Sequence, residues 1–181
     1  MARETEKTAK GKDIAEKKPI TVLAVGNLLL QDDGVGIHAL RELEKLELPP
    51  EVELVDGGTA GVDLLPIIEE AENLIVIDAV RGGCEPGAVY RLPWEALQET
   101  REEALSLHQV GFLEVMELAA YRGCAPSAVI IGIEPAVIDW GLELSPAVAR
   151  VLPKVVEVVC REIELLREKI SADRPAAGSQ S

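Results

Sequence analysis

The chain has 181 residues, with 18 Lys and Arg against 32 Asp and Glu, so that its formal net charge is −14 at pH 7. This charge repels phosphate backbones, and an aromatic content of 3% leaves few rings for base stacking, which excludes nucleic acid as an expected partner. The length fits one domain that buries roughly 70% of the surface its unfolded chain would expose.

Both ends of the chain differ in composition from its middle. Residues 1–18 mix basic and acidic side chains with almost no large apolar ones, and residues 171–181 are small and polar. Such segments cannot bury enough apolar surface to hold a fixed structure. We therefore expect mobile tails at 1–18 and 171–181 around a single domain at 19–170.

Short apolar runs rich in Val, Ile and Leu recur through this domain. They are too short for typical helices, so they predict strands. In chain order, the runs are ITVLAVG at 20–26, VELVDGG at 52–58, NLIVIDAV at 73–80, AVYRL at 88–92 and SAVIIGIEP at 127–135.

Helical segments separate these runs. The first has apolar residues at near-helical spacing and charged residues on the other face, which is typical of an amphipathic surface helix. Ser145 and Pro146 suit the cap and first position of the last helix, which Pro153 should kink or split. The predicted helices are 32–48, 61–72, 109–123 and Ser145 to about Ile170.

Alternating strands and helices, with strands apolar on both faces, predict an α/β fold. We expect a three-layer α/β/α sandwich with a twisted, mostly parallel five-stranded sheet. The run at 88–92 follows the preceding strand after a loop too short for a helical crossover, so this strand should be antiparallel.

Acidic residues close most of the predicted strands. In open α/β sheets the ligand site lies beyond the carboxyl ends of the strands, so these residues should share one edge. They are Asp32 and Asp33 after the first strand, Asp56 in VDGGT, Asp78 in IVIDAV and Glu134 in IGIEP.

Carboxylates that converge on one edge repel one another unless hydrogen bonds or a cation compensate, so their number favours a bound cation or a cationic partner. A structural alternative stays open for Asp32 and Asp56, since a single acid at this position is often a helix cap. Asp33 lies at the start of a helix, whose dipole favours an ionised carboxylate, and Gly34 and Gly36 should leave room there for a ligand.

The sequence has two histidines. His38 lies in the first turns of an amphipathic helix and is interpreted as a surface or packing residue, whereas His108 lies at a junction between a loop and a helix that can reach the sheet edge. Its alternative role is a cap or a local hydrogen bond. Two carboxylates and one imidazole would suit nickel, zinc or iron better than calcium or magnesium.

Several other classes of site are absent from the sequence. It has no GK[ST] of a P-loop, no GxGxxG and no GxSxG elbow. Its three cysteines are far apart, which favours packing over disulfides or a thiolate zinc site. No apolar run approaches a membrane span of about 20 residues, and the first residues lack the apolar middle of a signal peptide, so we expect a cytoplasmic protein without membrane insertion.

The ordered motifs resemble those of the hydrogenase maturation proteases, from about Thr21 to about Val159. GNLLLQDDGVG looks like the N-terminal signature of that family, and VDGGTAG, IVIDAV, LHQVG and GIEPAVIDWGLELSP follow in the family's order. The resemblance implies a similar five-stranded fold. It also implies removal of a short C-terminal extension from the large-subunit precursor of a nickel-iron hydrogenase after nickel insertion.

The resemblance also assigns site residues. It places metal contact on Asp33, Asp78 and His108, adds Asp56 as a further acid, and so gives a catalytic set of these four. Glu134 and Asp139 are expected to serve substrate contact or structure.

Our main hypothesis is an endopeptidase of aspartic or nickel-dependent type, in which the precursor presents the nickel to a monomeric enzyme. Nickel then either polarises the scissile carbonyl or a water, or serves as a checkpoint while Asp33 or Asp56 is the base. The alternatives are a non-catalytic chaperone that checks for nickel and, on architecture alone, an unrelated hydrolase.

Overall fold

The computed structural model describes residues 18–99 and 107–173, without the side chains of 97–99 and 107–110. The predicted tails lie outside the described residues, except that Lys18 belongs to the first strand and residues 171–173 to the last helix. The described domain therefore includes Lys18 and residues 171–173, which the sequence assigned to the tails.

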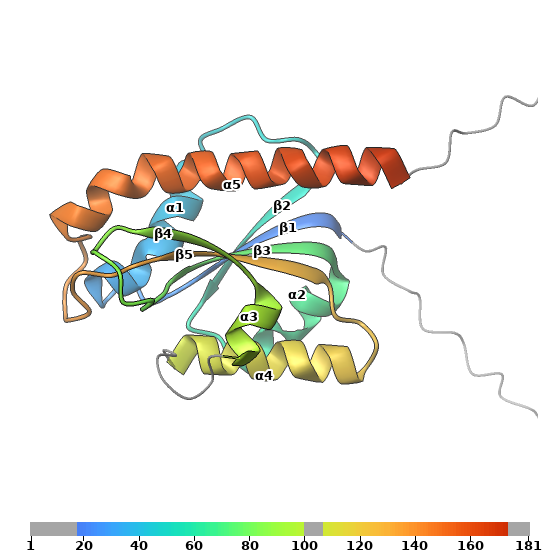
Figure 1. The fold of residues 1–181 in the computed structure, drawn as a ribbon, viewed down its shortest axis with the longest axis horizontal. Coiled ribbons are helices and arrows are strands. Elements are labelled where there is room, and N and C mark those ends of the chain that lie inside the picture. The colour runs from blue at the N-terminus through green and yellow to red at the C-terminus, as the bar shows by residue number, and fades with distance from the viewer. Residues whose placement is uncertain (1–17, 100–106, 174–181) are drawn as a thin grey trace, which may run out of the picture.

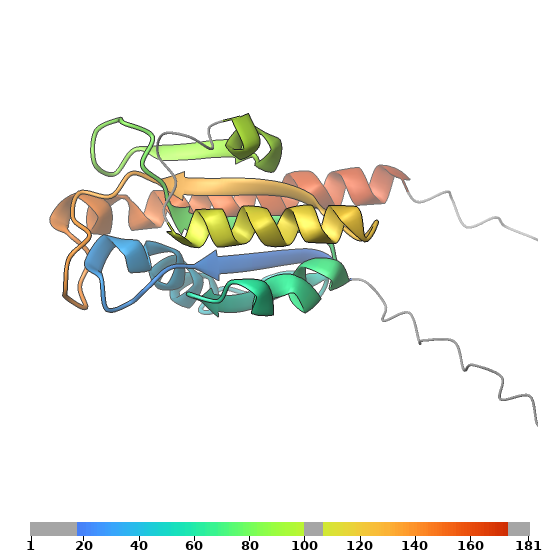
Figure 2. The same cartoon turned by 90° about the horizontal axis from the view of Figure 1, so that it is seen from below.

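A five-stranded sheet forms the centre of the molecule, and all five strands fall on the predicted apolar runs. The strand order is β2-β1-β3-β5-β4, in which β4 pairs antiparallel with β5 and every other pair is parallel. Figure 2 shows β4 at one edge of the sheet, running against β5. The strands are β1 (Lys18–Val25), β2 (Val52–Gly58), β3 (Ala71–Ala79), β4 (Val89–Pro93) and β5 (Ser127–Ile133).

Helices cover both faces of this sheet, which confirms the predicted three layers (Figure 1). Helices α1 and α5 pack on one face, whereas α2 and α4 pack on the other. The α-helices are α1 (Val35–Leu43), α2 (Leu65–Glu70), α3 (Trp94–Glu99), α4 (Leu107–Tyr121) and α5 (Pro146–Asp173), and two short 3-10 helices are η1 (Gln31–Gly34) and η2 (Val62–Leu64).

The apolar runs are buried because alternate side chains of each central strand enter different layers. In β1, Ile20 and Val22 pack toward α1 and α5, whereas Leu23 and Val25 pack toward α2 and α4. A strand buried on both faces needs an unbroken apolar sequence, which explains why the central strands were recognisable.

The sheet gives the molecule two distinct ends. The parallel strands finish at one edge, called here the carboxyl edge, where α1 and α4 begin (Figures 1 and 2). The first residues of β1 and the last turn of α5 lie at the opposite end, the amino edge. No helix within 18–99 or 107–173 is both long and apolar enough to cross a membrane.

Several local features differ from the sequence prediction, including the ends of two helices, since α1 ends at Leu43, and Ala71 and Glu72 already belong to β3. Helix α3 was not predicted. Helix α5 is one continuous helix with Pro153 inside it, so the proline does not split the segment. Ser145 caps this helix as predicted, since its side-chain oxygen accepts a hydrogen bond from the Val148 N–H at 3.4 Å.

Candidate functional site at the carboxyl edge

The segment GNLLLQDDGVG forms a tight turn that folds η1 and α1 back onto the end of β1. Gly26 has a φ of 139°, and a Cβ there would lie 2.0 Å from the Asp33 carbonyl oxygen. A Cβ on Gly36 would lie 2.4 Å from the carbonyl oxygens of both Val25 and Ile77. The expectation that Gly36 leaves room for a ligand is therefore wrong, because the backbone of β1 and β3 fills that space.

This close packing brings Asp33 and Asp78 to the same corner of the carboxyl edge. Asp33 lies in η1, which contacts β3, and Asp78 follows Ile77 in β3. Both side chains are buried, with 4% and 3% of their surface exposed. The Asn27 N–H donates to Asp33 Oδ2 at 3.0 Å, and the Ala79 N–H donates to Asp78 Oδ1 at 2.8 Å. Backbone hydrogen bonds thus hold both carboxylates in place.

Asp32 has a structural role that differs from the role of its neighbour Asp33. Its carboxylate is fully buried and accepts three backbone hydrogen bonds, from Ala136 and Val137 at 2.9 and 3.0 Å and from Ser145 at 2.7 Å. It therefore fixes the loop between β5 and α5. The adjacent acids divide into Asp32, which holds a loop, and Asp33, which lies at the candidate site.

Asp56 lies at the end of β2, on the other side of β1 from Asp78. It is exposed, and its Oδ1 accepts a hydrogen bond from the Gly58 N–H at 2.9 Å. The register pairs Asp56 with Ala24, which packs toward α1, whereas Asp78 lies on the face that α4 covers. Asp56 thus shares the carboxyl edge with Asp78 but not its face of the sheet.

Glu134, at the end of β5, belongs to a buried hydrogen-bond network. Its Oε2 accepts hydrogen bonds from the Tyr90 hydroxyl and from the N–H groups of Gly82 and Cys84, the last two at 2.8 and 3.3 Å. Burial alone would raise the pKa of Glu134, but these hydrogen bonds outweigh it and lower the pKa. Burial, followed by the bond to Glu134, raises the pKa of Tyr90. The network ties the loop between β3 and β4 to β5, a structural role.

The two histidines begin different helices at this edge. His108 is near the start of α4. This end of α4 lies next to η2, since a Cβ on Gly111 would lie 3.7 Å from the Gly61 Cα. The His108 side chain lies outside the described residues. His38 is half-buried in α1, where burial and then the charge of Arg41 lower its pKa, despite a hydrogen bond with the Leu142 backbone. That environment suits a packing residue.

Among the residues that the structure describes, no group of three His, Cys, Asp or Glu side chains is placed to hold a metal ion. The predicted set of Asp33, Asp78 and His108 therefore depends on the His108 side chain. Residues that the sequence did not single out include Asn27, whose backbone holds Asp33, and Tyr90, which holds Glu134. A backbone contact leaves no trace in the side-chain pattern.

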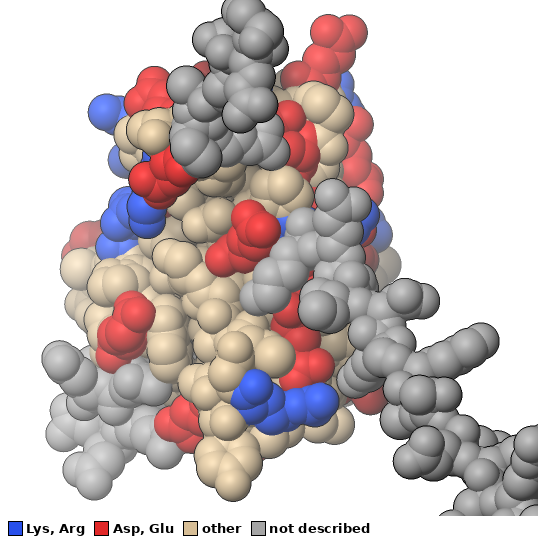
Figure 3. All heavy atoms as spheres, turned by 90° about the vertical axis from the view of Figure 1, so that its right-hand side faces the viewer, with Lys and Arg blue, Asp and Glu red and all other residues tan. Residues whose placement is uncertain are grey.

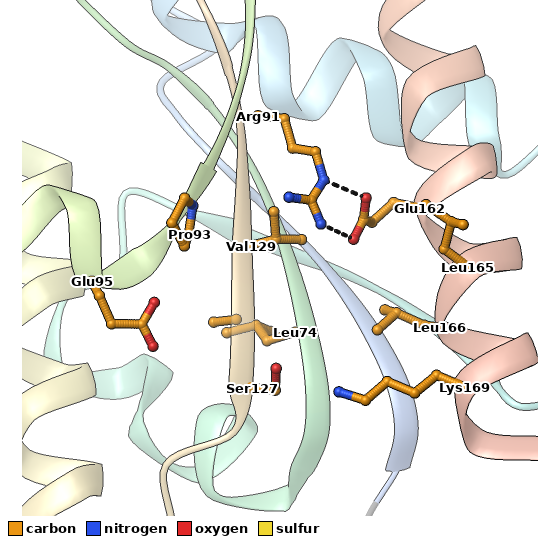
Figure 4. Close-up of a pocket in the computed structure, with 11 residues that line it drawn as sticks. Leu74, Arg91, Pro93, Glu95, Ser127, Val129, Glu162, Leu165, Leu166 and Lys169 are labelled. Atoms are coloured by element: carbon orange, nitrogen blue, oxygen red, sulfur yellow. Dashed lines mark hydrogen bonds and ion pairs between the residues drawn. The ribbon is translucent and has the colours of Figure 1, made fainter. Parts of the chain in front are cut away.

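A pocket of about 330 Å³ lies at the amino edge, away from these acids. Figure 4 shows Arg91 and Glu162 in its wall, joined by two hydrogen bonds of 2.7 Å that link β4 to α5. Leu74 and Ser127, from the first halves of β3 and β5, also line it. The pocket is therefore separate from the candidate site.

Comparisons of the sequence and of the structure with known proteins both find proteins of hydrogenase maturation. Residues 37–162 match the HycI family, described as hydrogenase maturation protease. The hydrogenase expression/formation protein HupD of Bradyrhizobium diazoefficiens is 37% identical over 146 residues, which cover 78% of this chain and 76% of that protein.

Two solved structures extend this comparison. The hydrogenase maturating endopeptidase HybD from Escherichia coli superposes with a TM-score of 0.75 at 32% identity, covering 83% of this chain and 93% of that one. The [NiFe] hydrogenase maturation protease HybD from Thermococcus kodakarensis gives a TM-score of 0.68 at 28% identity, covering 80% and 98%.

Proposed function

Because this chain belongs to the hydrogenase maturation protease family, we propose that it is the endopeptidase that removes the C-terminal extension of a nickel-iron hydrogenase large-subunit precursor. The observation that carries the proposal for this site is the pair of buried carboxylates, Asp33 and Asp78, at neighbouring strand ends. Similar proteins named as maturating endopeptidases support the reaction class.

Nickel enters this proposal as part of the substrate. Asp33, Asp78 and His108 contact the nickel that the precursor holds, which brings the scissile peptide to the carboxyl edge. A buried carboxylate interacts strongly with a cation, because the surrounding protein screens charge less than water does. Three protein ligands without a thiolate hold nickel weakly by themselves, so the enzyme as purified should carry little tightly bound metal.

Hydrolysis needs a base that accepts a proton from the attacking water and returns it to the leaving amine. Asp33 and Asp56 are the two candidates. Asp56 is exposed, so bulk water reaches its carboxylate directly, whereas Asp33 is buried beside the proposed nickel position. In Asp56→Asn, a loss of kcat with unchanged precursor binding would assign the base to Asp56, and an unchanged kcat would exclude Asp56 as the base.

The decisive experiment compares matched precursor samples, nickel-free and nickel-loaded, by the mass of the large subunit after incubation. We expect the enzyme to shorten only the nickel-loaded sample. Equal cleavage of both samples would refute nickel recognition, although the protein would still be a protease. Cleavage of neither sample, with firm binding of the loaded one, would instead support a nickel-checking chaperone.

The histidines provide a matched pair of variants for the same assay. His108→Ala should keep the fold but abolish processing, because it removes the proposed nitrogen ligand. His38→Ala should process the precursor at nearly the normal rate, since His38 is a half-buried packing residue of α1. Equal activity of the two variants would remove His108 from the site.

A further inference from the structure

Exposed apolar side chains gather on two loops of the carboxyl edge, beside the candidate site. We call this group the apolar rim. It consists of Leu29 in the loop after β1 and of Val137, Trp140 and Leu142 in the loop after β5. Their exposed fractions are 52%, 41%, 77% and 67%, respectively.

The two loops of the apolar rim are joined by backbone hydrogen bonds. Gly141 donates to the Leu29 carbonyl and accepts from the Gln31 N–H, both at 3.0 Å, and Leu30 forms an isolated parallel bridge with Gly141. Both views show the loop that follows β5 lying beside the loop that follows β1 (Figures 1 and 2). The pairing brings Leu29 next to the segment that carries Trp140.

The apolar rim is also held in place before any partner binds. The buried carboxylate of Asp32 accepts hydrogen bonds from Ala136, Val137 and Ser145, on both sides of the Trp140 segment. A surface that is already ordered loses little conformational entropy on binding. Asp33 is bonded to the loop that carries Leu29, since its carboxylate accepts from the Asn27 N–H at 3.0 Å and its own N–H donates to the Leu30 carbonyl at 3.2 Å, so this part of the rim borders the proposed nickel site.

Clustering separates the rim from ordinary surface hydrophobics. Exposed large apolar residues elsewhere are spread over several elements, such as Val62 in η2, Tyr121 at the end of α4 and Leu165 in α5. Single exposed apolar residues are normal, whereas a contiguous patch marks an interaction site, and Trp is a frequent anchor in interfaces.

The charges around the rim indicate what kind of partner fits it. Segments 27–40 and 135–145 contain no Lys or Arg, and the acids of the second segment, Asp139 and Glu143, are both exposed. Figure 3, which faces the amino edge, shows acidic and basic side chains dispersed among other residues there. The rim therefore suits an apolar segment bordered by basic side chains.

We infer that the apolar rim docks an apolar, Lys- or Arg-bordered segment of the large-subunit precursor next to the nickel-bearing residues. This inference rests on the proposed function, because we identify the occupant from the position of the rim next to the proposed nickel site. The rim would supply affinity and register for the precursor, while the acids of the carboxyl edge contact its nickel.

The test measures KM and kcat for nickel-loaded precursor with Trp140→Ala and Leu142→Ala. Both side chains are mostly exposed, so these variants should unfold at the same urea midpoint as the wild type. We expect KM to rise about tenfold or more for Trp140→Ala, with kcat little changed, because the contact is made equally in the ground and transition states. Tyr121→Ala, at the far end of α4 and 91% exposed, is the matched control and should leave KM unchanged.

The outcomes separate this inference from the proposed function. A wild-type protein that cuts no precursor contradicts the proposed function. Normal cutting by the wild type with an unchanged KM in Trp140→Ala overturns docking at the rim. Light scattering tests whether a second copy of this chain occupies the rim instead. A wild-type dimer that becomes monomeric in Trp140→Ala, with unchanged KM, would assign the rim to that second copy. This result would also overturn the inference.

Charge reversal tests the predicted basic border of the segment. The double variant Asp139→Lys and Glu143→Lys should raise KM at low salt, and the difference from wild type should shrink as added salt screens these exposed charges. A lower KM in the reversed variant would contradict the predicted charge of the precursor segment.

Discussion

Replacing Asp32 with Ala tests whether this buried carboxylate holds the loop between β5 and α5. The change leaves the N–H groups of Ala136, Val137 and Ser145 without their acceptor. An unsatisfied buried donor costs about 1–3 kcal/mol. Because the three donor residues are exposed or half-exposed, water will recover part of this cost, so we expect the free energy of unfolding to fall by about 3 kcal/mol.

Urea unfolding, followed by far-UV circular dichroism, measures this loss of stability. The variant should still be folded in water, because a domain of ordinary stability has a free energy of unfolding of about 5–15 kcal/mol. Asp32→Asn keeps one acceptor oxygen and should lose about half as much. Asp139→Ala is the control, since Asp139 is exposed and accepts a hydrogen bond from the neighbouring Trp140 N–H, so its loss should stay below about 1 kcal/mol. A loss in Asp32→Ala no larger than in this control would refute the assigned role.

Three further predictions concern features away from this loop. Tyr90→Phe removes a hydrogen bond to Glu134 and should raise its pKa, which an NMR titration of the carboxyl carbon measures. Folding lowers the pKa of Glu134 from its ordinary value of 4.5, so this carboxylate stabilises the wild type above pH 4.5. The stabilisation is lost as the pH falls through the folded-state pKa. This pH dependence of stability should be weaker in Tyr90→Phe. Arg91→Leu should lower the free energy of unfolding by about 2–3 kcal/mol, since Glu162 is buried, and a loss under about 0.5 kcal/mol would contradict this. Deleting residues 2–17 should change neither the melting temperature nor the cleavage rate, and a large fall in either would show that the segment contributes to the fold or the site.

The fold could be predicted because its signals are local. Strands buried on both faces need continuous apolar runs, and the short loop before Val89 allows only an antiparallel neighbour. Pro153 shows what local reasoning leaves open, since the sequence predicts a kink or a split and the helix stays continuous. It lacks the N–H that would complete a helical bond, but Val148, Val155 and Val159 are all buried along the same helix. Their burial, about 1.5–3 kcal/mol each, outweighs a helix penalty of about 3 kcal/mol.

The candidate site was only partly predictable. Strand ends identified Asp33 and Asp78, because residues that end parallel strands meet at one edge. No local pattern separates Asp32 from Asp33, since the two are adjacent and chemically identical. Their difference arises from the loop at 136–145, more than a hundred positions away, which supplies three backbone donors to Asp32. The same distance hides the apolar rim, which exists only when that loop lies beside Leu29.

The positions of Lys18 and Asp173 have a practical consequence for immobilisation. Both the start of β1 and the end of α5 lie at the amino edge, away from the acids and the apolar rim (Figure 1). A biotin or a surface anchor attached through either end of the domain would therefore leave the carboxyl edge facing the solution. A large folded precursor would then reach the acids and the apolar rim from the side opposite the anchor.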